Sequence, residues 1–143
     1  MATLGTLIKC VTLSSTVAAI AGYGLTALAD APTPTNSAEV KFSSVASLLS
    51  NNCTACHNSE DRIANLVLEP AGLYEAIVGK ASGESKWPLI TPFKPAESYL
   101  YAKMVGTHEK LAGSGVQMPA GQPPLPAIEI DLVRRWIEQG ARR

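Results

Sequence analysis

The stretch Cys53-Thr54-Ala55-Cys56-His57 is the most informative part of this 143-residue sequence. Its two cysteines are three positions apart, so on a helical turn both side chains leave the same face of the backbone. A histidine follows directly. Upstream, Phe42, Val45 and Leu49 recur at intervals of three and four residues, which predicts a helix over residues 38–51. The motif is therefore expected at the C-terminal end of a helix.

The donor set of this motif suits a covalently bound haem. Two thiols on one face can form thioether bonds with the two vinyl groups of the porphyrin, and the next residue is then placed to bind the iron. The motif predicts one haem c per chain, attached through Cys53 and Cys56, with His57 as an axial iron ligand.

Three other uses of the motif fit less well. A structural zinc site needs four ligands, and beyond the motif the sequence offers only His108 or a carboxylate as the fourth. A thioredoxin-like redox pair expects a preceding strand within a βαβ pattern, and no such pattern is visible. A disulfide between Cys53 and Cys56 would be strained and would close almost no loop.

The first 29 residues have the form of a secretory signal peptide. Lys9 is their only charged residue, Val11 to Ala29 is apolar or small, and Ala27-Leu28-Ala29 is a small-residue cleavage site. Cleavage near Ala29 would remove Cys10 and predicts a periplasmic protein. The alternative is an uncleaved membrane anchor, since the 19 residues from Val11 to Ala29 can span a bilayer.

After the signal, the chain divides into a short lead-in and one domain. Residues 30–37 are rich in proline and threonine, which predicts an extended segment. Residues 38–143 form the expected domain, whose composition excludes a disordered chain because 46% of all residues are hydrophobic and only 17% are charged. The 12 basic and 12 acidic residues balance, which argues against a nucleic-acid partner.

The domain is expected to be all-α, with about four helices and long loops. Apolar spacing and end signals predict further helices near 70–79, over 96–105 and over 126–140. Three prolines exclude a regular helix or a central strand from 86–95, and prolines and glycines exclude a helix from 107–124. No run alternates between apolar and polar residues, so no strand is predicted. Two long loops in so small a domain are explained if they wrap a cofactor.

The second axial ligand is sought among Met104, His108 and Met118. Met104 lies on the apolar face of its predicted helix, where core packing is the usual role. His108 lies in a polar stretch and is expected at the surface, although it remains an alternative ligand. Met118 is the predicted ligand, because Pro119 restricts the backbone while nearby glycines permit close approach to the porphyrin. An open sixth position is the other alternative.

Four features, in this order, resemble monohaem class I-type cytochromes c, and particularly the small bacterial domains of the planctomycete type. They are Cys53 to His57, Pro95-Ala-Glu-Ser-Tyr-Leu100, Met118-Pro119 and Trp136-Ile-Glu-Gln-Gly-Ala141. The resemblance implies a cytochrome c-like fold, His57 as proximal ligand and Met118 as distal ligand.

The resemblance also implies that the first and last helices cross against each other. Phe42, Val45 and Leu49 would then contact the apolar face of the last helix, formed by Ile130, Val133, Trp136 and Ile137. A backbone carbonyl is expected to accept the ring N–H of His57, and the loop around Pro88 or Pro92 is the candidate.

These expectations predict an electron carrier rather than an enzyme. Iron held by a histidine and a methionine has no vacant position, and nothing resembles a hydrolase triad, a phosphate loop or a nucleotide fingerprint. The expected partners are the cytochrome c maturation machinery and redox proteins that dock transiently onto a monomer. Two alternatives are a haem sensor or enzyme with an open sixth position, using His108 as the distal group, and a haem subunit of a larger oxidoreductase.

Overall fold

The computed structural model describes residues 38–143, and the predicted signal peptide (1–29) and lead-in (30–37) lie outside this part. The described chain is mostly helical and contains no named strand, as expected of an all-α chain. Its α-helices are α1 (Phe42–Cys53), α2 (Leu73–Ile77), α3 (Tyr99–Val105) and α4 (Ala127–Glu138), and its short 3₁₀ helices are η1 (Ile63–Asn65), η2 (Pro95–Glu97) and η3 (His108–Leu111). Within residues 38–143, no helix is long and apolar enough to cross a membrane.

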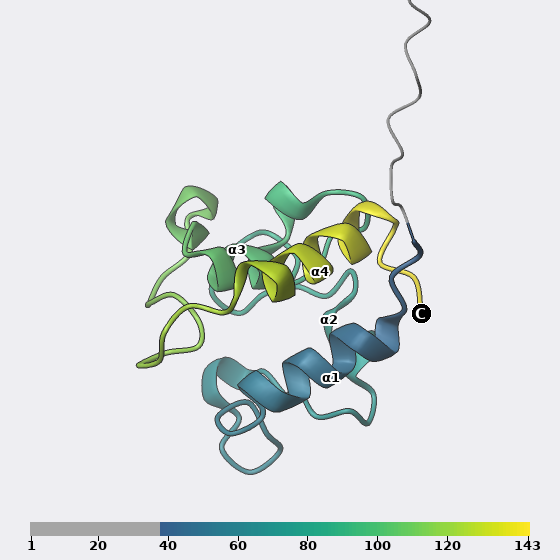
Figure 1. Ribbon diagram of the computed structural model, residues 1–143. Helices are drawn as coiled ribbons and strands as arrows, with labels where there is room; N and C mark the ends of the chain where they lie inside the picture. Colours follow the sequence, from purple (N-terminus) through teal and green to yellow (C-terminus); the bar gives the residue numbers. More distant parts are fainter. Residues whose placement is uncertain (1–37) are drawn as a thin grey trace, which may run out of the picture. The chain divides into compact units, whose positions relative to one another are not determined.

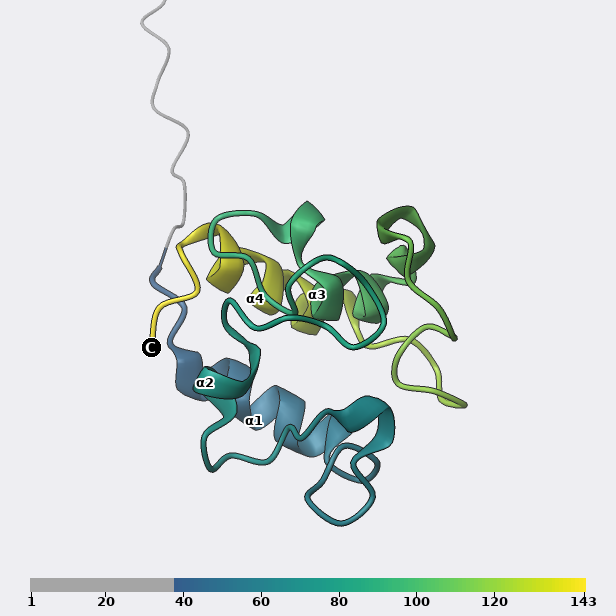
Figure 2. The same ribbon diagram turned by 180° about the vertical axis from the view of Figure 1, so that it is seen from behind.

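The helices form two layers. In both views α1 lies beside α2, and α3 lies beside α4 (Figures 1 and 2). The first layer is joined by an edge-to-face contact between Phe42 of α1 and Tyr74 of α2, whose ring centroids are 5.2 Å apart. The layers meet where α1 packs on α4.

Trp136 of α4 is the centre of the contact between α1 and α4. Its side chain is completely buried, its ring centroid lies 5.5 Å from that of Phe42, and its Nε1–H donates to the carbonyl of Arg142 at 2.8 Å. Val45 and Leu49 of α1 and Val133 and Ile137 of α4 are also completely buried. The expected packing of the first helix on the last is therefore confirmed.

Two predicted boundaries were wrong. The first helix begins at Phe42 rather than at residue 38, and it continues to Cys53. The predicted helix over 96–105 is instead a 3₁₀ turn, η2, followed by α3, with Ser98 extended between them. The Ser98 hydroxyl accepts from the amide of Thr91 at 2.9 Å and donates to the carbonyl of Lys94 at 2.9 Å. Such side-chain bonds to the backbone compete with helical bonding at this position.

The predicted loops contain short ordered contacts. In the segment before α3, Val78 pairs with Ile90 and Ala81 pairs with Pro88 as isolated bridges. The amide of Leu100 then donates to the carbonyl of Leu89 at 2.9 Å, which attaches this segment to α3. In the loop 107–124, helix was excluded by prediction, but η3 occupies its first residues.

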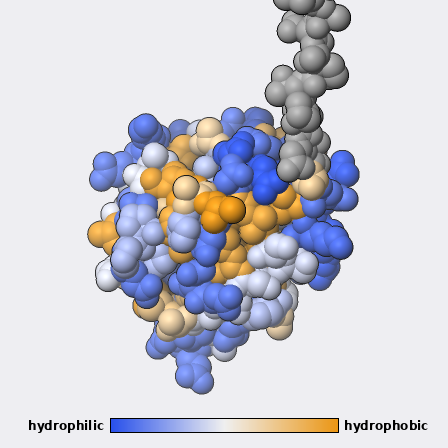
Figure 3. Space-filling model, in the orientation of Figure 1, coloured by the Kyte–Doolittle hydropathy of each residue, from blue (hydrophilic) through white to orange (hydrophobic). Residues whose placement is uncertain are grey.

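Apolar side chains are not confined to the interior of the described chain. Figure 3 shows apolar surface in the middle of the face drawn in Figure 1, with polar side chains around it. The large apolar residues that remain exposed are Ile63, Phe93, Val116 and Ile128. Single exposed apolar residues are common in proteins, so these matter only where they border a site.

Gly140, just beyond α4, tests how tightly this end of the helix packs. Its φ is 95°, and a Cβ there would lie 2.6 Å from Cζ of Phe93. We expect Gly140→Ala to lower the free energy of unfolding by about 1–2 kcal/mol, through the left-handed backbone and the displaced ring. Urea unfolding measures the change.

Gly79→Ala is the matched control. Gly79 also has a positive φ, of 68°, but a Cβ there would meet nothing within 4 Å. Gly79→Ala therefore measures only the cost of the left-handed backbone. An equal decrease in the free energy of unfolding in both variants would show that the contact with Phe93 contributes nothing.

Candidate functional site

The end of α1 presents the two cysteines. Thr54 keeps a helical conformation, with φ −70° and ψ −15°, and its hydroxyl donates to the carbonyl of Ser50 at 2.6 Å. The amides of Cys56 and His57 both donate to the carbonyl of Cys53, at 3.2 and 2.9 Å. The helical turn therefore continues through the motif, as its spacing predicts.

The two thiols are free and differ in exposure. Cys53 is half-buried and Cys56 is exposed. Burial raises the pKa of the Cys53 thiol to about 11, so this cysteine stays protonated at neutral pH. A redox-active pair uses a thiolate with a lowered pKa. The direction of this shift is the opposite, which disfavours a thioredoxin-like use of the motif.

His57 is held by the backbone of η1. Its side chain is 9% exposed, and its Nδ1 lies 3.0 Å from the carbonyl oxygen of Ile63. Because a carbonyl only accepts, Nδ1 carries the proton and Nε2 keeps a free lone pair, which is the form of imidazole that binds metals. The main chain at His57 is also held by a backbone hydrogen bond, because the amide of Leu68 donates to the His57 carbonyl at 2.8 Å.

The prediction that the loop around Pro88 or Pro92 supplies this carbonyl was wrong. The chain instead folds back within six residues of His57 to place Ile63 beside the ring. Two non-glycine residues around Ile63, Arg62 and Ala64, are left-handed, with φ of 47° and 55°. Such a reversal without glycine has no recognisable sequence signal, because these conformations cost energy that only the surrounding contacts offset.

Two adjoining hollows open beside the motif. Both are lined by His57, Ile63, Leu100 and Met118. Their empty spaces are about 650 and 670 Å³, counting the parts open to solvent. Cys53 and Cys56 line one of them, together with apolar residues that include Leu68 and Met104. All four predicted site residues therefore border the same space.

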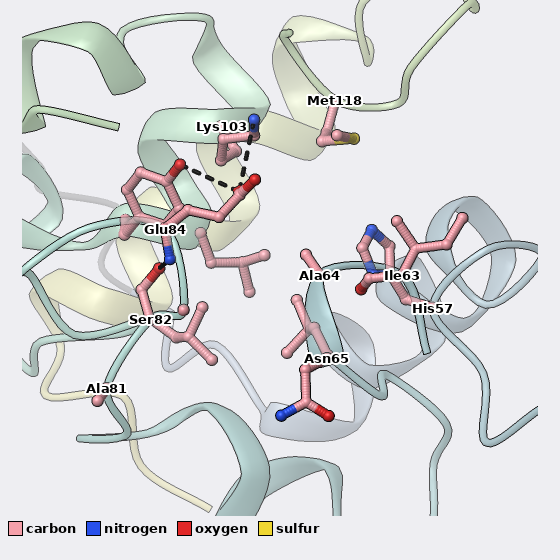
Figure 4. Close-up of a pocket in the computed structure, with 14 residues that line it drawn as sticks. His57, Ile63, Ala64, Asn65, Ala81, Ser82, Glu84, Lys103 and Met118 are labelled. Carbon is pink, nitrogen blue, oxygen red and sulfur yellow. Dashed lines mark hydrogen bonds and ion pairs between the residues drawn. The ribbon is translucent and has the colours of Figure 1, made fainter. Parts of the chain in front are cut away.

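Met118 approaches this space from the opposite layer. It lies on the loop between η3 and α4, and its amide donates to the carbonyl of Lys103 in α3 at 2.9 Å. Figure 4 shows the Met118 sulfur and the His57 ring on opposite sides of the hollow. Residues that are 61 positions apart in the sequence thus face one another across a largely apolar gap.

The other candidate ligands take different positions. Met104 is 2% exposed and belongs to the core, although it also lines one hollow. His108 was expected at the surface, and this was wrong, because its side chain is only 4% exposed and lies outside the lining of both hollows. Its ring Nε2 lies 3.0 Å from the carbonyl of Gly115. The loop after α3 folds over the ring, which a polar local sequence does not reveal.

The zinc alternative lacks a donor cluster in the described part of the chain. There, no group of three or more His, Cys, Asp and Glu side chains converges on one point. His108, the one histidine considered as the fourth ligand, has its ring against the backbone carbonyl of Gly115 instead.

A polar cluster in the wall of the first hollow was not anticipated. Tyr99 donates through its hydroxyl to Glu84 at 3.2 Å, and the ammonium of the buried Lys103 lies 3.9 Å from the same carboxylate (Figure 4). Burial, and then the charge of Glu84, raise the pKa of Tyr99. Glu84 comes from the segment between α2 and α3, so only tertiary structure brings these three groups together.

No protein-family model, no curated protein and no solved structure matches the chain. Two free thiols, an imidazole with an available lone pair and a thioether sulfur border one apolar space.

Proposed function

We propose that this chain is an exported monohaem c-type cytochrome of the class I type that transfers electrons and is not an enzyme. The observation that carries the proposal is that Cys53, Cys56, His57 and Met118 all line one hollow. In the adjoining hollow, His57 and Met118 again lie across from one another (Figure 4). These residues would hold one haem c, with thioether attachment through the cysteines and iron ligation by His57 and Met118. We also propose a cytochrome c-like fold, with which the helical architecture is compatible.

When bound, the haem supplies one-electron chemistry at its iron. The residues around the haem would orient its ligands, limit its contact with water and influence its potential. The Ile63 carbonyl orients the His57 ring and fixes the tautomer in which Nε2 is free, as contacts to metal-binding histidines do. Leu68, Leu100 and Met104 line the hollow with apolar surface and keep water away. A thioether ligand in such surroundings favours reduced iron, so the potential should lie above that of a bis-histidine haem.

One specific observation disfavours a haem sensor or enzyme. That alternative needs an acid-base group beside an open sixth position, and His108 was the residue considered for it. His108 is instead buried, bonded to Gly115 and outside the lining of both hollows. A haem subunit of a larger oxidoreductase would use the same site as a free carrier, and stable copurification with a partner would distinguish it.

The remaining expectations follow from this role. The protein would be matured in the periplasm by the cytochrome c maturation machinery and would act as a monomer on redox partner proteins rather than on nucleic acid. Ile63, which is 51% exposed, lines both hollows, and Val116, which is 59% exposed, lines a third hollow on the loop that carries Met118. A small apolar rim of this kind suits brief docking more than permanent assembly.

The test is the visible spectrum of protein matured in a periplasm, compared between two matched methionine variants. Met118→Leu should lose the weak far-red band of methionine-bound ferric haem, and its ferrous form should bind carbon monoxide readily because a coordination site is vacant. Met104→Leu, a substitution of the same size in the core, should leave both properties as in the wild type.

Two results would contradict the proposal. Wild-type protein that carries no covalent haem would remove the cytochrome assignment. Wild-type ferrous protein that binds carbon monoxide as readily as Met118→Leu would mean that Met118 is not a firm ligand, and the sensor or enzyme alternative would then lead.

A further inference from the structure

We propose that His108 is a positioning residue for Met118, which holds the methionine loop on the domain so that the sulfur stays across the hollow from His57. The methionine loop comprises residues 113–118. The inference rests on the proposed function, since it concerns the loop that supplies the second iron ligand. His108 is buried and is not one of the proposed iron ligands.

The buried ring of His108 forms a single hydrogen bond. Its Nε2 lies 3.0 Å from the carbonyl of Gly115, so Nε2 carries the proton and donates. Its Nδ1 is buried and has no hydrogen-bond partner. An unpartnered buried nitrogen is unfavourable, and an apolar side chain would fill the same space without that cost. The bond to Gly115 is the compensating feature.

His108 forms two hydrogen bonds with the methionine loop. Besides the ring bond to Gly115, its backbone carbonyl accepts from the amide of Gly113 at 3.0 Å. These two contacts hold the loop on either side of Ser114. Because only Gly106 and Thr107 separate η3 from α3, these contacts fix the beginning of the loop relative to the wall of the site.

The rest of the loop is attached to α3. Lys103 donates through its ammonium to the carbonyl of Ser114 at 2.8 Å, and the Met118 amide donates to the carbonyl of Lys103 at 2.9 Å. The side-chain amide of Gln117 donates to the carbonyl of Met104 at 2.9 Å. The loop itself has no regular secondary structure. Its position therefore depends on these attachments, and among residues 38–143 His108 supplies the one side-chain bond to the loop that comes from outside α3.

The test measures how often Met118 leaves the iron in ferrous holoprotein. At saturating carbon monoxide, the binding rate equals the rate of Met118 release. His108→Phe keeps an aromatic ring but removes the donor, and we expect release to become about tenfold faster, in line with the loss of one buried hydrogen bond. His108→Gln retains an N–H that can reach the Gly115 carbonyl and should restore the rate to near that of the wild type.

Thr91→Val is the matched control away from the loop. The Thr91 hydroxyl donates to the carbonyl of Glu97 at 2.9 Å, so its loss also removes one side-chain bond to a backbone carbonyl. This variant should be less stable to urea while its Met118 release rate stays unchanged. If His108→Phe behaves in the same way, with lower stability and an unchanged release rate, the positioning role is overturned.

A measurement on the wild type covers the case in which His108→Phe does not fold. The ring N–H of His108 should exchange with solvent at the Met118 release rate, because both events require the loop to open. Exchange only on global unfolding would overturn the proposal. Failure of the proposed function is distinguishable, since wild-type protein would then show no methionine ligation before any variant is made.

Discussion

The double variant Cys53→Ala/Cys56→Ala is expected to contain no covalently bound haem. The two sulfurs leave one helical turn at the end of α1 and border the hollow that His57 also lines. Without thiols no thioether bond can form, so any haem that enters must dissociate when the protein is denatured. Mass spectrometry of the denatured, intact chain measures this directly. The wild type should carry the added mass of one haem, and the double variant should carry none.

Two comparisons sharpen this experiment. Each single variant, Cys53→Ala or Cys56→Ala, retains one thiol and should keep a haem attached through a single thioether bond. Cys10→Ala should behave as the wild type, because Cys10 belongs to the predicted signal peptide. A double variant that still holds a covalent pigment would contradict the assignment of the motif. A wild type that holds one zinc ion in place of haem would do the same.

Trp136→Ala should cause the largest loss of stability of any single change in the domain. The side chain is completely buried between α1 and α4 and also donates a hydrogen bond to the Arg142 carbonyl. Removing a buried tryptophan costs about 3–5 kcal/mol, whereas whole domains are stable by only about 5–15 kcal/mol. Urea unfolding of the wild type and the variant, compared by midpoint and slope, measures the difference.

Trp87→Ala is the matched control, because Trp87 is the other tryptophan of the chain and is only half-buried. It should cost clearly less than Trp136→Ala. Trp136→Phe separates packing from hydrogen bonding, since it keeps a ring against Phe42 and loses the donor to Arg142. Equal losses in both tryptophan-to-alanine variants would show that the contact between α1 and α4 is not the principal core of the domain.

Local patterns in the sequence predicted much of what lies close together along the chain. The spacing of apolar residues identified α1 and α4, with errors of a few residues at their ends. Short-range geometry also predicted that the turn through Cys53 and His57 stays helical. Such features depend on neighbouring residues only, so the periodicity of the helix is sufficient to find them.

Long-range contacts could be predicted only where a strong apolar pattern or a family resemblance pointed to them. The packing of Phe42 on Trp136 followed from such a resemblance. The break at Ser98 did not, because it depends on a bond from Thr91 that the sequence does not signal. Likewise, no local pattern predicted that Glu84 and Lys103 would line the same hollow.

The sequence by itself determined the chemical groups of the candidate site: two thiols and an imidazole on one turn, and a methionine on a later loop. Only the tertiary structure decided how those groups are held. The fold places the Ile63 carbonyl on the His57 ring and buries His108 against the Gly115 carbonyl. Backbone carbonyls are the same in every residue and burial is set by distant segments, so neither partner can be read from residue types. The donor set is local in origin, whereas its orientation is a property of the whole domain.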